Sequence, residues 1–216
     1  MKYFVGEWYA DQAIMYSILD SIDFYKCGRT GTVMEGIPKN GRSMMWGASW
    51  RRTCKQNTKV PGTNLHYTKC REQNPELEHV FKEYVGIYWK NFKFTQVQMN
   101  KNFPCPPHKD GTNVGNSILV GFGNYTGGDI NVEQPDGSVF KMDIRDENGI
   151  IFNGANSLHW VSPFSCEEGD ARYSLVFFNS SYNKKDPDLG TGIIYHKDVT
   201  SAKFQPVVED AMWGKT

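Results

Sequence analysis

The chain lacks the cysteine pattern that holds small folds together. It has five cysteines, an odd number, which lie far apart and include no Cys-x-x-Cys pair. Disulfide frameworks need evenly paired cysteines, and structural zinc sites need closely spaced ones. We therefore expect reduced thiols, with neither a disulfide framework nor a zinc site.

Long apolar runs are also missing. No stretch approaches the ~20 consecutive apolar residues that a transmembrane helix needs. The N-terminal sequence MKYFVGEW is interrupted by charge too early to be a signal peptide. We predict a soluble, intracellular protein with no membrane segment.

Acidic residues are absent from one segment, Gly36 to Arg71, which contains eight basic residues. The whole chain has 24 basic and 24 acidic residues, so the remainder carries 16 against 24, a formal charge of −8. This segment is a candidate anion-binding surface. It also contains Trp46, Trp50 and Tyr67, and cations with stacking rings suit a flipped or single-stranded base. The alternative is a solvated basic loop with two core tryptophans.

The length of 216 residues predicts one domain, and 21 Gly with 10 Pro indicate many turns. Apolar residues at helical spacing predict amphipathic helices over 7–22 and 75–89. After about residue 92 the pattern changes to short β-branched and aromatic runs between turns, typical of a jelly roll or barrel. The expected strands are 92–99, 117–122, 129–132, 149–152, 158–161 and 172–178.

We divide this single domain into three parts. Residues 1–91 are a helical and basic region on the substrate side, and residues 92–180 are the β core. Residues 181–216 form a polar C-terminal extension to which the sequence assigns no role. The fold class is mainly β with flanking helices.

One tripeptide, His108-Lys109-Asp110, could bind a metal, because alternate residues of an extended chain point to the same side. The tripeptide recurs at His196-Lys197-Asp198, where no histidine follows. The first copy is followed 51 residues later by His159 in a strand-like run. Two imidazoles and one carboxylate form the facial triad of non-haem Fe(II) oxygenases, which leaves coordination positions open. Taken alone, His159 would be interpreted as a core histidine.

Arg172 and Ser174 follow His159 and are expected on one face of the last strand. A guanidinium and a hydroxyl two residues apart can hold a carboxylate, the first by a paired charge-assisted contact and the second by a further hydrogen bond. An arginine that faces the inside of a barrel needs such an anion. Taken alone, Arg172 would be interpreted as one half of a surface ion pair.

Together, the HxD motif, the Gly-Gly turn in NYTGGD (124–129), the distal histidine and Arg-x-Ser resemble the Fe(II)/2-oxoglutarate dioxygenase superfamily over residues 96–178. The resemblance implies a double-stranded β-helix (jelly-roll, cupin-like) core and consumption of 2-oxoglutarate and O2, with release of succinate and CO2. It implies three iron ligands: His108, Asp110 and His159. It also implies that Arg172 and Ser174 bind the C5 carboxylate of 2-oxoglutarate and that Asn100 touches this co-substrate.

Within the superfamily, HKDGTNVGNSILVGFGNYTGGD with a terminal RYSLVFF is most similar to the TET/J-binding-protein-like branch. That branch oxidises the methyl group of 5-methylpyrimidines in nucleic acid, which the basic segment 39–71 would then contact. Prolyl hydroxylases share several features but commonly have Lys where this chain has Arg172. A protein side chain or a small molecule remains an alternative substrate. A cupin that does not use 2-oxoglutarate and a non-catalytic binding module also remain open.

Overall fold

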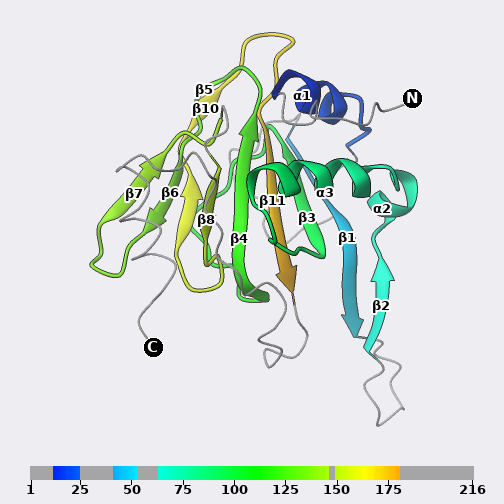
Figure 1. The fold of residues 1–216 in the computed structure, drawn as a ribbon. Coiled ribbons are helices and arrows are strands. Elements are labelled where there is room, and N and C mark those ends of the chain that lie inside the picture. Colours follow the sequence, from blue (N-terminus) through cyan, green and yellow to red (C-terminus); the bar gives the residue numbers. More distant parts are fainter. Residues whose placement is uncertain (1–11, 25–40, 53–62, 146–148, 181–216) are drawn as a thin grey trace.

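The computed structural model describes residues 12–24, 41–52, 63–145 and 149–180, and its regular structure is mostly antiparallel β (Figure 1). The helices are α1 (Gln12–Asp20), α2 (Lys69–Gln73) and α3 (Leu77–Tyr88). The strands are β1 (Arg42–Arg52), β2 (Thr63–Tyr67), β3 (Gln96–Lys101), β4 (Asn113–Phe122), β5 (Thr126–Gly127), β6 (Ile130–Glu133), β7 (Val139–Met142), β8 (Ile150–Phe152), β9 (His159–Val161), β10 (Phe164–Ser165) and β11 (Tyr173–Ser180).

The strands form one large and two small antiparallel sheets. The large sheet has the order β2-β1-β3-β11-β4-β8, and the smaller ones have the orders β7-β6-β9 and β10-β5. Strand β11 lies between β3 and β4, which joins the C-terminal end of the described chain to its middle. The predicted class, mainly β with flanking helices around a double-stranded β-helix core, is confirmed.

The two faces of the large sheet differ in character because side chains alternate along each strand. On β11, Tyr173, Leu175 and Phe177 are fully buried in the core, and the alternate residues Ser174 and Val176 line a cavity. The same alternation holds on β3 and on β1. One face of the sheet is therefore an aromatic and aliphatic core, and the other forms the wall of the cavity.

Helix α3 covers the apolar face and fixes its position (Figure 1). Phe81 makes edge-to-face contacts with Trp46 of β1 and Phe177 of β11, at centroid distances of 5.5 and 5.7 Å. Tyr84 stacks on Phe177 and contacts Phe122 of β4. Burial of one such ring contributes about 1.5–3 kcal/mol, so this aromatic cluster holds three strands of the cavity wall in place.

The predicted elements all match observed ones, but helix α2 and strands β5, β7 and β10 overlap no predicted run. Helix α3 and strands β3, β4, β6, β8, β9 and β11 each overlap a predicted run, and α1 lies within the predicted helix over 7–22. Strands β1 and β2, inside the basic segment, were not predicted. Strand β1 pairs with β3 and thereby extends the cavity wall.

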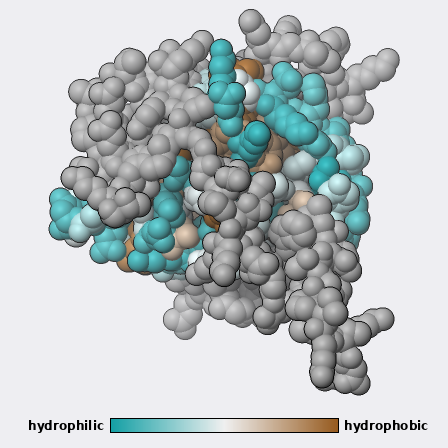
Figure 2. All heavy atoms as spheres, turned by 60° about the horizontal axis from the view of Figure 1, so that its bottom comes forward, coloured by the Kyte–Doolittle hydropathy of each residue, from teal (hydrophilic) through white to brown (hydrophobic). Residues whose placement is uncertain are grey.

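The surface seen in Figure 2 is mainly hydrophilic over the described residues, with a group of apolar residues visible between them. Among the described residues, no helix is long and apolar enough to cross a membrane.

Candidate metal centre

Backbone hydrogen bonds bring the three predicted metal ligands together. His108 and Asp110 lie in the connection between β3 and β4, and His159 is the first residue of β9. The amide of each histidine donates to the carbonyl oxygen of the other, both at 3.0 Å. The amide of Asp110 donates to the carbonyl oxygen of Gly154 at 2.8 Å. The main chain thus helps to fix all three positions.

Both imidazole rings are oriented by their second nitrogen. Nδ1 of His108 lies 2.6 Å from the Pro106 carbonyl oxygen, and Nδ1 of His159 lies 2.9 Å from that of Ser157. A carbonyl oxygen only accepts, so each Nδ1 carries the proton and each Nε2 keeps a free lone pair. Such an outer contact is typical of metal-binding histidines.

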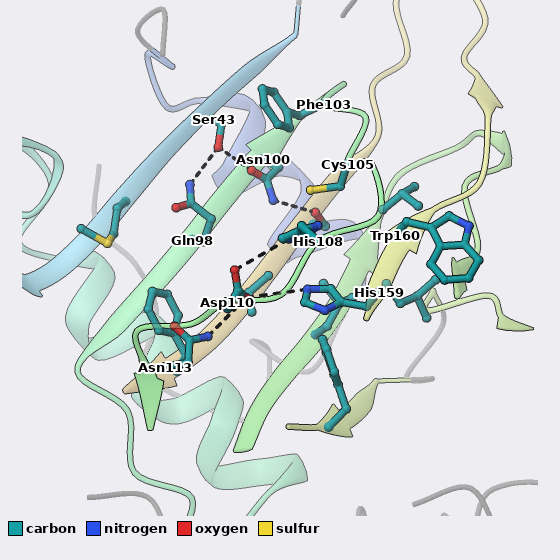
Figure 3. A pocket seen from close by; sticks show the side chains of 18 of the residues that line it. Ser43, Gln98, Asn100, Phe103, Cys105, His108, Asp110, Asn113, His159 and Trp160 are labelled. Atoms are coloured by element: carbon teal, nitrogen blue, oxygen red, sulfur yellow. Dashed lines mark hydrogen bonds and ion pairs between the residues drawn. The ribbon is translucent and has the colours of Figure 1, made fainter. Parts of the chain in front are cut away.

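The two Nε2 atoms converge on one carboxylate (Figure 3). Nε2 of His108 lies 3.7 Å from Oδ1 of Asp110, and Nε2 of His159 lies 3.7 Å from Oδ2. One ligand atom from each of the three residues lies within 4.8 Å of the others. Two metal bonds of about 2.0–2.2 Å span at most about 4.4 Å, so small side-chain movements suffice to share one ion.

The chemistry of these donors fits Fe(II). Burial lowers the pKa of His159, so this ring is neutral near neutral pH, which is the form that binds metal. Two histidines and one carboxylate on one side of an ion leave the other positions free. Asn113 steadies the carboxylate: its Nδ2 lies 3.3 Å from Oδ2 of Asp110. Asn113 was not among the site residues predicted from the sequence.

The candidate centre opens into a cavity of about 420 Å³ between the large sheet and β6 and β9. None of the described residues that line it is Lys or Arg, and its only carboxylate belongs to Asp110. Apolar side chains make up much of the rest of the wall. These include Met45, Phe103, Leu119, Ile130, Phe152, Trp160, Val161, Val176 and Phe178.

Arg172 lies just before β11 and does not line the cavity, in contrast to Ser174, with which it was expected to share a face. Only 1% of it is exposed. Its Nη2 donates to the Gly128 carbonyl oxygen at 3.0 Å, and its guanidinium lies about equally far from the rings of Tyr125 and Phe164.

The guanidinium of Arg172 is incompletely satisfied. Among the described residues, its Nε has no hydrogen-bond partner, and no carboxylate lies within 4.0 Å of the group. Burial accordingly lowers the pKa of Arg172. A buried cation without an anion is costly. These features fit an arginine that receives a carboxylate ligand.

Tyr125 is a second incompletely satisfied group, and it was not predicted from the sequence. Its hydroxyl is buried and has no hydrogen-bond partner within 3.5 Å in the described part of the chain. Burial raises the pKa of this hydroxyl to about 12, although the nearby Arg172 guanidinium acts in the opposite direction. Its ring lies near two guanidinium groups, 4.2 Å from that of Arg145 and 5.2 Å from that of Arg172. Tyr125 belongs to the NYTGGD turn, which was interpreted from the sequence only through its two glycines. The same motif could therefore have indicated Tyr125 as a site residue.

No protein-family model and no curated protein matches the chain. Among solved structures, NgTET1 in complex with 5mC DNA is 17% identical, with a TM-score of 0.48 over 81% of this chain and 69% of that one. A Pseudomonas putida prolyl-4-hydroxylase is 13% identical, with a TM-score of 0.47 over 84% and 91%. An oxidoreductase of the 2OG-Fe(II) oxygenase family from Burkholderia pseudomallei is 16% identical, with a TM-score of 0.42 over 77% and 76%.

Asn100, which the resemblance connects with the co-substrate, lies on β3 in the cavity wall and is buried. Its neighbours across the sheet are Ser43 of β1 and Ser174 of β11. Its side chain accepts from Ser43 at 2.6 Å and donates to Ser174 at 3.2 Å. Asn100 is therefore part of a polar row across three strands.

The basic segment differs from its predicted form where the structure describes it. Trp46 was expected among rings available for base stacking, but it is 3% exposed and packs beneath α3. Tyr67 is exposed, with the guanidinium of Arg71 over its ring, and Arg71 also pairs with Glu78 at 2.6 Å. The segment is thus partly neutralised by α3.

Several other predicted features lie outside the described residues. These are Lys39, Lys55 and Lys59, the side chains of Trp50, Arg51 and Arg52, and the second HKD at residues 196–198.

Proposed function

We propose that the protein is a non-haem Fe(II)- and 2-oxoglutarate-dependent dioxygenase that hydroxylates a C–H bond. One observation carries the proposal most directly: both Nε2 lone pairs face the same carboxylate at 3.7 Å. Main-chain carbonyls hold the two rings in that orientation. His108, Asp110 and His159 would hold the iron.

The co-substrate would lie between the metal centre and Arg172. The buried guanidinium of Arg172, which has no carboxylate partner among the described residues, would supply charge for the distal carboxylate. The hydroxyl of Tyr125, and that of Ser174 on the cavity wall, would add hydrogen bonds. A charge-assisted contact of this kind is worth about 1.5–3 kcal/mol. Because Arg172 lies behind the cavity wall, its side chain or a neighbour must adjust when the ligand binds.

Iron, 2-oxoglutarate and O2 together supply an oxidant that converts a substrate C–H to C–OH, with release of succinate and CO2. The protein holds the reacting groups in place and keeps water away from them. The apolar walls formed by Phe152 and Leu119 serve the second purpose. Asn113, bonded to Asp110, keeps the carboxylate turned toward the histidines.

The cavity favours a substrate whose reacting group is uncharged, because its described lining contains no cation and only one carboxylate. The methyl group of a 5-methylpyrimidine fits this requirement, since the base is neutral and flat. The phosphates would then contact the basic residues of the segment from Lys39 to Arg71. We therefore propose a 5-methylpyrimidine in nucleic acid as the substrate. A prolyl side chain is also uncharged and is the competing candidate.

A direct comparison of substrates tests this proposal. The enzyme is incubated with Fe(II), 2-oxoglutarate and oligonucleotides that contain 5-methylcytosine or thymine, single- or double-stranded, and in parallel with proline-containing peptides. We expect a gain of one oxygen, seen by mass spectrometry, and stimulated succinate release with an oligonucleotide. Oxidation of peptides alone would transfer the assignment to the prolyl class.

Two alternatives without 2-oxoglutarate chemistry predict different results. A cupin that binds metal without the co-substrate would take up iron and release no succinate. A non-catalytic binding module would need neither iron nor 2-oxoglutarate. Arg172 argues against both, because no described residue pairs its buried charge and neither alternative gives that charge a ligand.

A further inference from the structure

A directed chain of hydrogen bonds crosses the cavity wall (Figure 3). It begins at the main-chain carbonyl of Met44, which accepts from Nε2 of Gln98 at 2.9 Å. The same Nε2 also lies 2.9 Å from Oγ of Ser43. Ser43 Oγ lies 2.6 Å from Oδ1 of Asn100, whose Nδ2 lies 3.2 Å from Oγ of Ser174. Each link joins neighbouring strands of the large sheet.

The direction of this chain follows from its first member. A carbonyl oxygen can only accept, so the Gln98 atom beside it must be the amide nitrogen, whose other hydrogen points to Ser43. The Ser43 hydroxyl then donates onward and meets the amide oxygen of Asn100. This leaves the amide nitrogen of Asn100 to donate to Ser174. Every orientation is thus determined by the Met44 carbonyl.

The last member of the chain is left with an unused donor. Ser174 Oγ accepts from Asn100, and no described residue accepts the Ser174 hydroxyl proton. Ser174 is only 4% exposed and lines the cavity. The proton is therefore available to an acceptor inside the cavity. If the chain ran in the opposite direction, this proton would be used by Asn100 and the wall would offer a lone pair instead.

We propose that Ser43 and Gln98 are positioning residues that make Ser174 a hydrogen-bond donor to the distal carboxylate of 2-oxoglutarate. This inference rests on the proposed function, which supplies the ligand. Neither residue touches the ligand in this account, and both act through Asn100. The wall then discriminates in favour of a group that only accepts, and a carboxylate is such a group.

The test measures 2-oxoglutarate binding without turnover, by calorimetry on the full chain loaded with Zn(II). Ser174→Ala, Ser43→Ala and Gln98→Glu should each weaken binding about two- to tenfold, the value of one hydrogen bond. A glutamate at position 98 cannot donate to the Met44 carbonyl, so Ser43 turns toward it and the chain reverses. Ser43→Thr retains the hydroxyl and should restore wild-type affinity.

Two further measurements distinguish a positioning role from a general loss of structure in the cavity wall. The double variant Ser43→Ala/Ser174→Ala should bind no more weakly than Ser174→Ala, because both act through one donor. The ligand 2-oxopentanoate, which lacks the distal carboxylate, should bind equally to Ser43→Ala and the wild type. Ser180→Ala is the matched control. The Ser180 hydroxyl is on the same strand as Ser174 but donates to Gln96, so it is not part of the hydrogen-bond chain from Met44 to Ser174.

The outcomes are distinct. If the wild type binds 2-oxoglutarate but Ser43→Ala and Gln98→Glu bind equally well, the positioning role is wrong and the proposed function stands. The positioning role is also wrong if Ser43→Ala weakens the binding of 2-oxoglutarate and of 2-oxopentanoate equally, or if the effects of the two substitutions in the double variant are additive. If the metal-loaded wild type does not bind 2-oxoglutarate at all, the proposed function itself fails. If Ser43→Ala does not fold, the affinity of Gln98→Glu for 2-oxoglutarate tests the positioning role instead.

Discussion

The guanidinium of Arg172 lies directly against the backbone of Gly128. Its Nη2 donates to the Gly128 carbonyl oxygen at 3.0 Å, and a Cβ atom on residue 128 would lie 2.7 Å from its Nε. Gly128 also has a φ of 75°, a conformation that favours glycine. The Gly-Gly turn therefore makes room for the side chain that we propose as the carboxylate ligand.

Gly128→Ala should displace Arg172 and raise the 2-oxoglutarate concentration needed for half-maximal turnover. The chain offers a matched control in Gly137, which has a φ of 82° but no described atom within 4 Å of the place that a Cβ would take. Both alanine variants should lose about 1–2 kcal/mol of stability to backbone strain. Only Gly128→Ala should change the co-substrate dependence. Equal turnover curves for the two variants would contradict the proposed role of this contact.

Loss of any one triad residue should abolish iron retention, because two remaining protein ligands hold Fe(II) too weakly. His108→Ala, Asp110→Ala and His159→Ala are each compared with His196→Ala, which alters the second HKD. Iron content is measured by mass spectrometry after desalting, together with 2-oxoglutarate turnover. His196→Ala should match the wild type in both. Loss of iron in His196→Ala alone would show that the second HKD, and not the first, binds the metal.

Other divalent metals should compete for the same site. Co(II), Ni(II) and Zn(II) bind nitrogen and oxygen ligands at least as tightly as Fe(II), and we expect none of them to support the oxidative reaction. Turnover should therefore fall as Ni(II) is added and recover when Fe(II) is supplied in excess after chelation. Turnover that excess Ni(II) leaves unchanged would exclude a site of this ligand type.

Replacement of Arg172 should separate binding from stability. Arg172→Met removes a buried charge that no described carboxylate pairs, so the melting temperature of the ligand-free protein should stay level or rise. Affinity for 2-oxoglutarate should fall about tenfold to a hundredfold, with iron content unchanged. Arg172→Lys retains the charge without the fork and should be milder. Normal 2-oxoglutarate affinity in Arg172→Met would place the carboxylate contact elsewhere.

The β core was predictable because its strands carry strong local signals. Alternation in RYSLVFF predicts which residues of β11 face the core, and the structure places Leu175 and Phe177 there. The spacing of His108, Asp110 and His159 predicted a shared site, and their donor atoms do converge. The alternation within a strand and the order of the metal-binding motifs can both be read directly from the sequence, so these features were predictable.

Other features depended on contacts between distant segments. The polar row links Ser43 to Asn100, 57 residues apart, and Asn100 to Ser174, 74 residues apart. Strand β1 was missed because its basic and glycine-containing sequence resembles a loop, and it becomes a strand by pairing with β3. The sequence left open whether Trp46 is a stacking ring or a core residue for the same reason, since only α3 shows that its ring is covered.

Oxidation of 2-oxoglutarate with iron and O2 is the reaction that we propose for this cavity. The most direct measurement is succinate formed from 2-oxoglutarate by purified, Fe(II)-reconstituted protein, compared with His159→Ala and with an anaerobic sample. We predict slow succinate formation by the wild type even without substrate, and none in either comparison. Absence of succinate from the iron-loaded wild type, with and without candidate substrates, would show that the protein is not a 2-oxoglutarate-dependent dioxygenase.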